Sequence, residues 1–431
     1  MADLHKLAQM LHELDDQMAA CMKCGMCQSV CPVFAETMSE ADVTRGKIAL
    51  LENLSGELVN DAEGVKERLN KCLLCGSCAA NCPSGVKIMD IFLKGRCIVN
   101  TYLGLPAAKK LVFRNLLTRP KLFNAMLDTA SIFQGAVTSK GDELLGTSCA
   151  RMLDPIIGKR HFVPLAKKAF HRHVSALDEQ AGFSGLRVAF YPGCAVDKFF
   201  PNVGLAALKV LKHHGVGVYM PSGQVCCGLP SLASGDIEGF LKQAAKNVAL
   251  FGDASFDYLI TPCGSCTAAF KELWPKFVSE MPSSERAAAM QIAEKAIDIN
   301  EFIVDKLDIT LPEPETTGGI PLTYHDPCHL DKSLNVSSQP RALLKANPKY
   351  DFREMKEHNR CCGNGGTFNL FHYEVSKKIG ERKRDNVIAS GAKVVATGCP
   401  ACMMQLNDVL SQSHAGVEVK HSIEIYAETL D

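Results

Sequence analysis

The sequence predicts an α/β protein with a helical N-terminal domain and a duplicated C-terminal part that forms two parallel sheets. Three observations predict this arrangement. Most of the 20 cysteines fall into two kinds of repeated motif. Helical periodicity dominates between the first cysteines, and strands alternate with helices after about residue 185. Such alternation is typical of parallel sheets, because parallel neighbours need a crossover connection, usually a helix.

The composition excludes several classes of protein. The 431 residues include 47 Lys+Arg and 47 Asp+Glu, so the chain lacks the basic excess of nucleic-acid-binding proteins. No run of about 18 apolar residues is present, so we expect no transmembrane helix. The first residues, MADLHKLAQMLHELDDQM, read as a charged amphipathic helix without the apolar core of a secretory signal. We therefore expect a cytoplasmic protein, or one held peripherally on the inner face of the cytoplasmic membrane.

Residues 1–100 contain two copies of the motif C-x2-C-x2-C-x3-C-P. In two-cluster bacterial ferredoxins with this spacing, the fourth cysteine of each run binds the other cluster. Gly25 and Gly76 permit the tight turn that such a loop needs. The insert at about 41–70 reads as helical, which predicts an α-helical ferredoxin domain; two zinc sites are the simpler alternative. The cubane 4Fe–4S cluster assignments are Cys21, Cys24, Cys27 and Cys82 for the first, and Cys72, Cys75, Cys78 and Cys31 for the second.

Residues 101–184 are predicted to form a helical, basic linker or docking segment. Between 101 and 180 there are 12 Lys+Arg and 6 Asp+Glu, and apolar residues recur at helical spacing, as in Leu122 and Met126. Pro120 should break the helix. A basic amphipathic surface can dock on a membrane or a partner subunit. We favour the simpler interpretation, a linker packed on its own core with a solvated basic face.

Residues 185–315 and 316–431 are two copies of one domain. The first copy contains YPGC, VCCG and TPCGSC, and the second contains HDPC, RCCG and TGCPAC, at offsets of 134, 135 and 136 residues. In each copy a strand leads to the first cysteine and a helix follows it. A second strand precedes the paired cysteines in the first copy, a helix comes after the pair in both copies, and a third strand ends at the last motif. The carboxyl ends of parallel strands converge. We therefore expect five thiols per copy at one site, and two sites facing each other across a pseudo-two-fold axis.

Five thiolates are one too many for a cubane cluster, and two adjacent thiols suit an open, irregular cluster. The pattern is similar to the CCG domain of heterodisulfide reductase catalytic subunits. That resemblance implies a noncubane 4Fe–4S cluster with five cysteine ligands in each copy, although one copy could instead hold zinc or a conventional cluster. Cys97 and Cys149 are left over as ordinary buried cysteines. The implied ligands are Cys194, Cys226, Cys227, Cys263 and Cys266 in the first copy, and Cys328, Cys361, Cys362, Cys399 and Cys402 in the second.

The order of a two-cubane domain followed by two CCG domains resembles the iron–sulfur subunits of glycolate oxidase and respiratory D-lactate dehydrogenase. Two segments resemble those subunits in particular: CGMCQSVCPVF and TRGKIALLENL. YPGCAVDKFFPNVG and CCGLPSLASGD look equally like the iron–sulfur subunit of anaerobic glycerol-3-phosphate dehydrogenase. The resemblance implies an electron-transfer subunit that takes electrons from an FAD-containing partner oxidising lactate or glycolate and passes them to quinone or another membrane acceptor. No G-x-G-x-x-G follows a strand, so we expect no FAD or NAD on this chain.

Two histidines beside a predicted ligand are candidate proton donors. His325 and His329 flank Cys328 at short range, and they could protonate a quinone or a disulfide reduced at the second CCG site. The simpler interpretation is that they hold the loop through hydrogen bonds. Two rival functions remain: a heterodisulfide-reductase-like catalytic subunit, and a non-enzymatic metal-storage protein, for which an ordered series of clusters would have no purpose.

Overall fold

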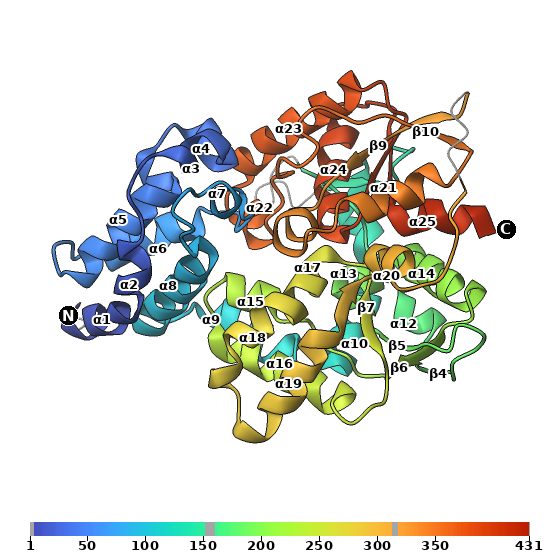
Figure 1. Cartoon of the computed structure of the whole chain (residues 1–431). Helices are drawn as coiled ribbons and strands as arrows, with labels where there is room; N and C mark the ends of the chain where they lie inside the picture. The colour runs from blue at the N-terminus through green and yellow to red at the C-terminus, as the bar shows by residue number, and fades with distance from the viewer. Residues whose placement is uncertain (1–3, 151–159, 313–317, 431) are drawn as a thin grey trace. The chain divides into compact units, whose positions relative to one another are not determined.

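The computed structural model describes residues 4–150, 160–312 and 318–430 (Figure 1). The chain divides into two compact units. The first comprises residues 1–115, 228–242 and 363–380, and the second comprises 116–227, 243–362 and 381–431. The unit that contains the ferredoxin-like motifs therefore also includes the segment that follows each paired-cysteine motif. The domain boundaries expected from the sequence stay a prediction.

The first unit is helical, as the sequence predicts. The expected helices of the insert are present as α5 and α6, and α3 and α7 begin directly after Gly25 and Gly76. These glycines have φ angles of 87° and 72°, which a side chain would disfavour. The helices are α1 (Leu4–Leu11), α2 (Asp15–Ala19), α3 (Met26–Val30), α4 (Pro32–Thr37), α5 (Thr44–Ser55), α6 (Ala62–Asn70), α7 (Ser77–Ala80), α8 (Ile88–Leu103) and α9 (Ala107–Lys110).

Helix α8 anchors the segment 228–242 within this unit. Its Arg96 side chain donates a hydrogen bond to the carbonyl oxygen of Ala233 at 2.5 Å, and Asn100 donates to that of Ser234 at 3.1 Å. The segment 363–380 packs against the ferredoxin-like motif, where Gly365 lies against Leu73. These segments contain α15 (Leu229–Ala233), α22 (Thr367–Phe371) and the first turns of α16 (Ile237–Phe251) and α23 (Tyr373–Ala389).

The basic segment contains a π-helix (Leu111–Leu116), α10 (Pro120–Val137), a small antiparallel sheet and α12 (Phe170–His173). Pro120 stands at the first position of α10, where its missing N–H costs nothing, so the predicted helix break is confirmed. The expectation that α10 packs its apolar stripe on its own core is wrong, because none of its described residues is fully buried. The strands are β1 (Thr138–Lys140), β2 (Ser148–Ala150) and β3 (His161–Phe162).

The second unit contains one parallel sheet from each copy, as predicted. The first copy has the order β4-β6-β5-β7-β8, with β4 antiparallel at the edge, and the second has β10-β9-β11-β12. The duplication extends to the register: Val188 pairs with Tyr258, and Leu322 with Val394, at the same offsets of 134 and 136 residues as the cysteines. The strands are β4 (Leu177–Asp178), β5 (Arg187–Phe190), β6 (Gly217–Met220), β7 (Tyr258–Thr261), β8 (Ala296–Asp298), β9 (Ile320–His325), β10 (Tyr350–Phe352), β11 (Val394–Thr397) and β12 (Glu418–His421).

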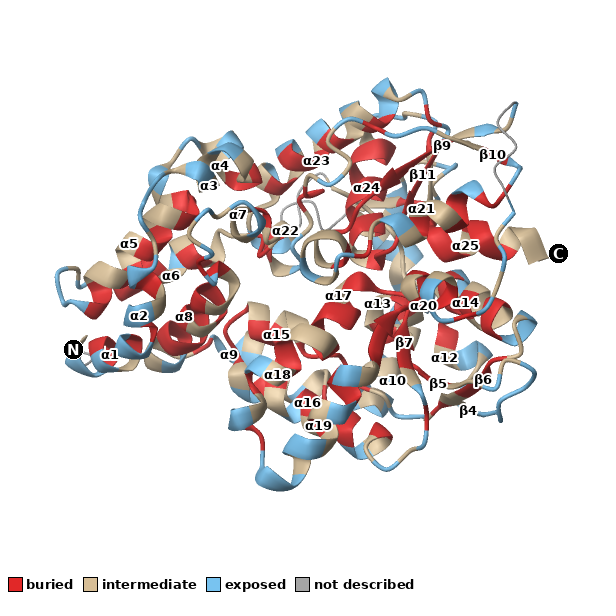
Figure 2. Cartoon of the chain, viewed as in Figure 1, coloured by how far each residue is buried: buried red, intermediate tan, exposed pale blue. Residues whose placement is uncertain are grey.

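The matching strand order is compatible with the expected pseudo-two-fold relation between the copies. Strands β8 and β12, which close the two sheets, and the short β10 were not predicted from the sequence. Because these strands are only three or four residues long, their alternation is too brief to recognise. Strands β7, β9 and β11 are mostly buried, as Figure 2 shows in red. Such burial on both faces is typical of parallel strands covered by helices.

Helices of the two copies pack against each other and build a shared core. Helix α14 contacts α25, and α20 contacts α21. Val210, Phe302 and Ile423 are 0% exposed in this core. Burying each such side chain contributes about 1.5–3 kcal/mol, so the two copies are held as one unit. The helices of this unit are α13 (Gly193–Lys198), α14 (Pro201–His213), α17 (Gly264–Ala268), α18 (Trp274–Lys276), α19 (Ser283–Lys295), α20 (Ile299–Asp305), α21 (Ser338–Lys345), α24 (Pro400–Gln412), α25 (Ser422–Ala427) and most of α16 and α23.

Candidate metal centres

The first unit contains a small cavity lined by one complete set of predicted ligands. Both cysteine motifs contribute, because the fourth cysteine of the second run reaches the three cysteines of the first. Arg45 also lines the cavity and donates a hydrogen bond to the carbonyl oxygen of Lys23 at 3.4 Å, on the loop that carries the thiols. The thiols are those of Cys21, Cys24, Cys27 and Cys82, with Cys78 at the edge.

A second small cavity brings together the other predicted set, Cys31, Cys72, Cys75 and Cys78. Backbone N–H groups point at two of these sulfurs: Phe34 donates to Sγ of Cys31, and Leu74 donates to Sγ of Cys72, each at 3.4 Å. Burial raises the pKa of Cys31 to about 11. A buried thiol of this kind becomes a thiolate when a metal is bound, because metal binding displaces the proton.

Two buried cations lie beside the second cavity. Lys47, which is 1% exposed, lines the cavity and donates to the carbonyl oxygen of Asp42. Arg96, which is 4% exposed, donates from Nη2 to the carbonyl oxygen of Cys72 at 2.8 Å. Buried positive charge is costly unless negative charge offsets it. The donors and charges around this cavity therefore fit an anionic iron–sulfur cluster.

The predicted ligands of the first copy lie where strands β5 and β7 end and on the loop after β6. Cys194 and Cys266 are in the first turns of α13 and α17, rather than on open loops. The Cys194 thiol contacts that of Cys226, and this contact, together with burial, raises the pKa of Cys194 well above its ordinary value. The Cys266 thiol contacts those of Cys227 and Cys263. The structure thus brings all five thiols of this copy to one edge of the sheet.

The second copy gathers its thiols in the same way. Cys402 contacts both Cys362 and Cys399, and Cys362 contacts Cys361. Cys328 begins the turn after β9, where Lys332 Nζ lies 3.9 Å from its sulfur. Four of these thiols are buried, and Cys328 is partly exposed. The second copy therefore offers the same donor chemistry as the first.

The two thiol sets meet. The thiol of Cys263 in the first copy contacts that of Cys399 in the second, and Ser265 Oγ lies 3.4 Å from Sγ of Cys399. Thiol contacts therefore continue without interruption from one copy to the other. The sequence predicts that the two sites face each other, but this direct contact is apparent only in the structure. The continuous series is Cys227, Cys266, Cys263, Cys399, Cys402, Cys362 and Cys361.

The predicted histidines occupy different environments. His325 is fully buried, and its ring lies with the sulfurs of Cys362 and Cys402 in a group whose donor atoms are all within 4.8 Å of one another. Its Nδ1 lies 3.2 Å from the carbonyl oxygen of His358. His329 is partly exposed on the turn after Cys328. Because His325 is enclosed, its geometry suits a hydrogen bond to a cluster sulfur better than proton transfer to an incoming substrate.

Two further buried polar residues occupy equivalent places in the two copies, and the sequence did not predict them. Asp298 ends β8 and His421 ends β12, each 0% exposed and each capping the helix that follows. Burial raises the pKa of Asp298 to about 7 and lowers that of His421 to about 4. Both interact electrostatically with Cys399. Asp298 follows the residues KAI and His421 follows EVK, so such short strands give no distinctive sequence signal.

The glycine after each cysteine pair is required by backbone geometry. Gly228 has φ +97°, and a Cβ atom there would lie 2.5 Å from Cδ2 of Phe240. We expect Gly228→Ala to lower the free energy of unfolding by about 2–4 kcal/mol, because backbone strain and a clash with a buried ring both contribute. Gly223→Ala is the control: its φ is +86°, but the space around its Cβ position is open. Urea denaturation showing equal losses for both variants would contradict the role assigned to Phe240.

Comparison with protein-family models identifies both parts of the chain. The cysteine-rich domain (CCG) matches residues 188–271 and 322–407, and the 4Fe-4S dicluster domain matches residues 17–86. The first model thus matches both copies of the duplicated part, and the second covers both ferredoxin-like motifs.

Curated relatives agree with this assignment, and a solved structure shares the fold. The chain is 30% identical over 406 residues to the probable glycolate oxidase iron-sulfur subunit of Bacillus subtilis, covering 91% of this chain and 89% of the relative. It is 27% identical to a subunit of the fumarate reductase (CoM/CoB) of Methanothermobacter marburgensis (95% of this chain, 72% of the relative), and 32% identical to lactate utilization protein A of Bacillus pumilus (56% and 98%). A hypothetical protein from Helicobacter pylori shares the fold, with a TM-score of 0.50, 9% identity, and coverage of 89% of this chain and 67% of that chain.

The family models indicate 4Fe–4S clusters, and the thiol cavities and buried cations of the structure fit such groups. Two of these relatives are named as subunits of oxidoreductases. Among the described helices, none is both long and apolar enough to cross a membrane. The chain belongs to the CCG-domain family of iron–sulfur oxidoreductase subunits, the family that includes the glycolate oxidase iron–sulfur subunit.

Proposed function

We propose that this chain is the electron-transfer subunit of a flavin-dependent 2-hydroxy-acid dehydrogenase complex. A partner FAD protein oxidises lactate or glycolate, and this chain relays the electrons to quinone or another membrane acceptor. The observation that carries the proposal is the arrangement of the thiols. Each of two cavities in the first unit is lined by one complete set of four predicted ligands, and an unbroken series of seven contacting thiols joins the two CCG copies.

The proposed cofactors are two cubane clusters and two noncubane clusters. The cubanes are held by Cys21, Cys24, Cys27 and Cys82, and by Cys72, Cys75, Cys78 and Cys31. Each noncubane cluster is held by the five cysteines of one CCG copy. When bound, such clusters supply one-electron transfer at a potential set by charge, hydrogen bonds to sulfur and solvent exposure.

The residues of this chain set those three conditions. Lys47 and Arg96 place positive charge near the second cubane set, and N–H groups such as that of Leu74 donate to the thiols. Four of the five thiols in each CCG copy are buried, which limits the access of water to the proposed noncubane sites. His325 offers the second noncubane site a donor group where the first copy has Tyr191, whose hydroxyl is already bonded to the carbonyl oxygen of Val225 at 2.6 Å.

Chain connectivity supports a relay from the second cubane set towards the second CCG copy. Gly365 packs against Leu73, which adjoins Cys72 in the sequence. Gly365 also lies three residues after Cys362, so the chain between them spans at most about 11 Å. A short covalent path therefore joins a predicted noncubane ligand to the neighbourhood of a predicted cubane ligand.

A second candidate function is reduction of a disulfide at the CCG sites. Its support is the similarity to the fumarate reductase (CoM/CoB) relative, together with the resemblance of the repeated motif to heterodisulfide reductase. The third option is an iron–sulfur subunit of anaerobic glycerol-3-phosphate dehydrogenase, and its support is limited to the residues of a few short motifs. We favour the 2-hydroxy-acid complex because the glycolate oxidase relative matches over most of both chains.

The test is anaerobic purification of the chain with its partners from its native cells, followed by mixing with candidate substrates. We expect about 16 iron atoms per chain, from four clusters of four, and a co-purifying FAD protein. Lactate or glycolate should bleach the iron–sulfur absorption within the turnover time of the complex. Bleaching by glycerol phosphate instead, or oxidation of the reduced clusters only by a disulfide, would select a rival. About 8 iron atoms per chain would show that only the ferredoxin-like domain is loaded.

A further inference from the structure

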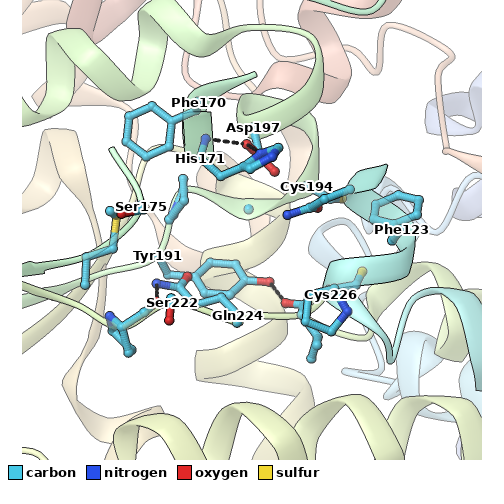
Figure 3. Close-up of a pocket in the computed structure, with 18 of the residues that line it drawn as sticks. Phe123, Phe170, His171, Ser175, Tyr191, Cys194, Asp197, Ser222, Gln224 and Cys226 are labelled. Atoms are coloured by element: carbon cyan, nitrogen blue, oxygen red, sulfur yellow. Dashed lines mark hydrogen bonds and ion pairs between the residues drawn. The ribbon is translucent and has the colours of Figure 1, made fainter. Parts of the chain in front are cut away.

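A cavity of about 300 Å³ in the second unit lies beside the thiols of the first CCG copy (Figure 3). Cys194 and Cys226, both predicted cluster ligands, form part of its wall. Its volume is at the lower end of small-molecule pockets, which are about 300–1,000 Å³, so it suits one or two fused rings rather than a dinucleotide. A molecule bound there would adjoin the predicted noncubane site directly.

The walls of this cavity are mainly apolar and aromatic. Helix α10 and the residues just before it contribute Leu117 and Phe123, α12 contributes Phe170, and Val174 and Met220 complete this surface. Tyr191 lies below the cavity, with its hydroxyl directed at a backbone carbonyl (Figure 3). Apolar and aromatic walls with few polar groups favour a neutral, flat ligand.

Three polar residues of the cavity wall, Asn124, His171 and Asp197, belong to one connected network that also includes Lys198 and Asp128. His171 Nδ1 lies 2.8 Å from Asp197 Oδ1, and the backbone N–H of His171 donates to the same oxygen at 2.8 Å; Figure 3 marks a bond between these two residues. Lys198, which is 3% exposed, pairs with Asp197 Oδ2 at 2.8 Å and donates to Asn124 Oδ1 at 2.7 Å. On the other side of the imidazole, Nε2 of His171 lies 3.5 Å from Asp128.

This network disfavours an anionic ligand. Lys198, a buried cation of this network, is neutralised by Asp197. The Asp128 carboxylate beyond the imidazole also lies 3.8 Å from Arg172. The exposed Lys121 at the rim can attract an anion only weakly, because solvent screens it. A hydroxy-acid carboxylate would therefore find no unpaired buried cation to bind, whereas a ring carbonyl could accept a hydrogen bond from His171.

The helix that walls the cavity presents a different face to solvent. Leu122, Met126, Phe133 and Val137 of α10 lie along one stripe, and they are 52%, 44%, 66% and 36% exposed. Basic residues flank this stripe: Arg119 and Lys121 at the start of α10, and Lys140 just beyond its end, are exposed. An exposed apolar stripe with basic flanks matches the pattern of helices that lie in the interface of an anionic bilayer.

We propose that this cavity binds a quinone from the lipid phase, with α10 lying on the membrane surface and His171 hydrogen-bonding one ring oxygen. The proposal rests on the proposed function and deepens it by locating the acceptor. Reduction of the quinone to a quinol adds two electrons and two protons. The hydroxy acid supplies the electrons through the iron–sulfur relay, and water supplies the protons at the exposed rim. His171 is a positioning residue and acts on the ring through its hydrogen bond.

The first experiment titrates the oxidised holoprotein with menadione, a soluble naphthoquinone, by isothermal titration calorimetry. Val174→Trp, which fills the cavity, should weaken binding at least tenfold. His171→Gln, which removes the imidazole while retaining a polar side chain, should weaken it about five- to tenfold. Leu144→Trp, an exposed position outside the cavity, should leave the dissociation constant within twofold. Iron content and urea midpoint verify that each variant is folded.

Absence of menadione binding, or unchanged binding in Val174→Trp, would overturn the location of the site. The second experiment tests the source of the ligand by flotation with vesicles of phosphatidylglycerol and phosphatidylcholine. The wild type should float with them, and Phe133→Asp should not. If the wild type does not float, the claim that the quinone comes from the lipid phase is wrong, but the assignment of the cavity as a quinone site is not affected.

The proposed function is tested separately from the site. In Val174→Trp, the flavoprotein partner should still reduce the clusters with lactate or glycolate, but reoxidation by menadione should slow at least tenfold. If the partner cannot reduce the clusters of the wild type, the proposed function is wrong. Fast reduction combined with unchanged reoxidation in the variant would reject only this acceptor site.

Discussion

Replacing Cys362 by serine is expected to remove one iron–sulfur cluster and leave the other three in place. Cys362 is buried, and its thiol contacts those of Cys361 and Cys402 in the second CCG copy. Serine is a poor ligand for iron in a thiolate site, because the hydroxyl is harder and far less acidic than the thiol. Iron content should fall from about 16 to about 12 atoms per chain.

The measurement combines iron analysis with electron paramagnetic resonance of the reduced protein. Signals from the two cubane clusters should persist in Cys362→Ser, because their proposed ligands lie in the ferredoxin-like motifs. Cys149→Ser is the matched control. The prediction that Cys149 is buried is wrong: it is a partly exposed cysteine of β2, outside every thiol set, with Sγ 3.1 Å from Ser139 Oγ. Retention of all iron in Cys362→Ser would show that the ligand assignment for the second copy is wrong.

Removing the Arg341 charge is expected to cause a large loss of stability, because this charge neutralises a buried carboxylate. Arg341 donates to both carboxylate oxygens of Asp326, at 2.8 and 2.7 Å, and the Asp326 side chain is 0% exposed. His358 Nδ1 also lies 2.6 Å from this carboxylate. Breaking such a buried pair leaves an uncompensated charge, so Arg341→Met should lower the free energy of unfolding by about 3–5 kcal/mol.

Urea denaturation of the holoprotein measures this loss, and Arg353→Met is the control. Arg353 pairs with Asp351 at 2.7 Å, but its side chain is 49% exposed, so the control should lose no more than about 1 kcal/mol. Equal losses in the two variants would contradict the role assigned to burial. Because Asp326 lies two residues before Cys328, Arg341→Met should also loosen the turn that presents this thiol.

The Asp326–Arg341 pair also predicts how the stability difference between the wild type and Arg341→Met depends on pH. Burial by itself would raise the pKa of Asp326, but hydrogen bonds from Arg341 and His358 outweigh it and lower the pKa below its ordinary value. A carboxylate with a lowered pKa stabilises the fold above its unfolded pKa of about 3.9, and this contribution is lost as the pH falls through the folded pKa. The gap between wild type and Arg341→Met should therefore be largest near neutral pH and shrink below about pH 4.

The sequence predicts the cysteine sets and the fold class because both depend on local patterns. Cluster ligands recur at fixed short spacings, so Cys21, Cys24 and Cys27 can be recognised without knowing the rest of the fold. The duplication is equally visible, since its three motifs recur at nearly constant offsets. Strands such as β7 and β11 were predictable because they are apolar runs that end at a cysteine motif.

The prediction for α10 was wrong for a physical reason. Helical spacing shows that a helix has an apolar stripe, but it does not show which surface covers that stripe. In the structure, Phe123 and Asn124 line a cavity, while Leu122 and Phe133 face solvent. Only the position of the helix in the fold separates these two faces.

The amino-acid sequence by itself determined the grouping of the cysteines into repeated motifs, the duplicated α/β architecture and the family resemblance. The tertiary structure decided which sites touch, through Cys263 and Cys399, and which cavity adjoins them, through His171 and Asp197. The physical reason is the range of the interactions. Ligand spacing and strand alternation are set by neighbours along the chain, whereas cavities, buried ion pairs and contacts between copies join residues that are distant in sequence and adjacent only after folding.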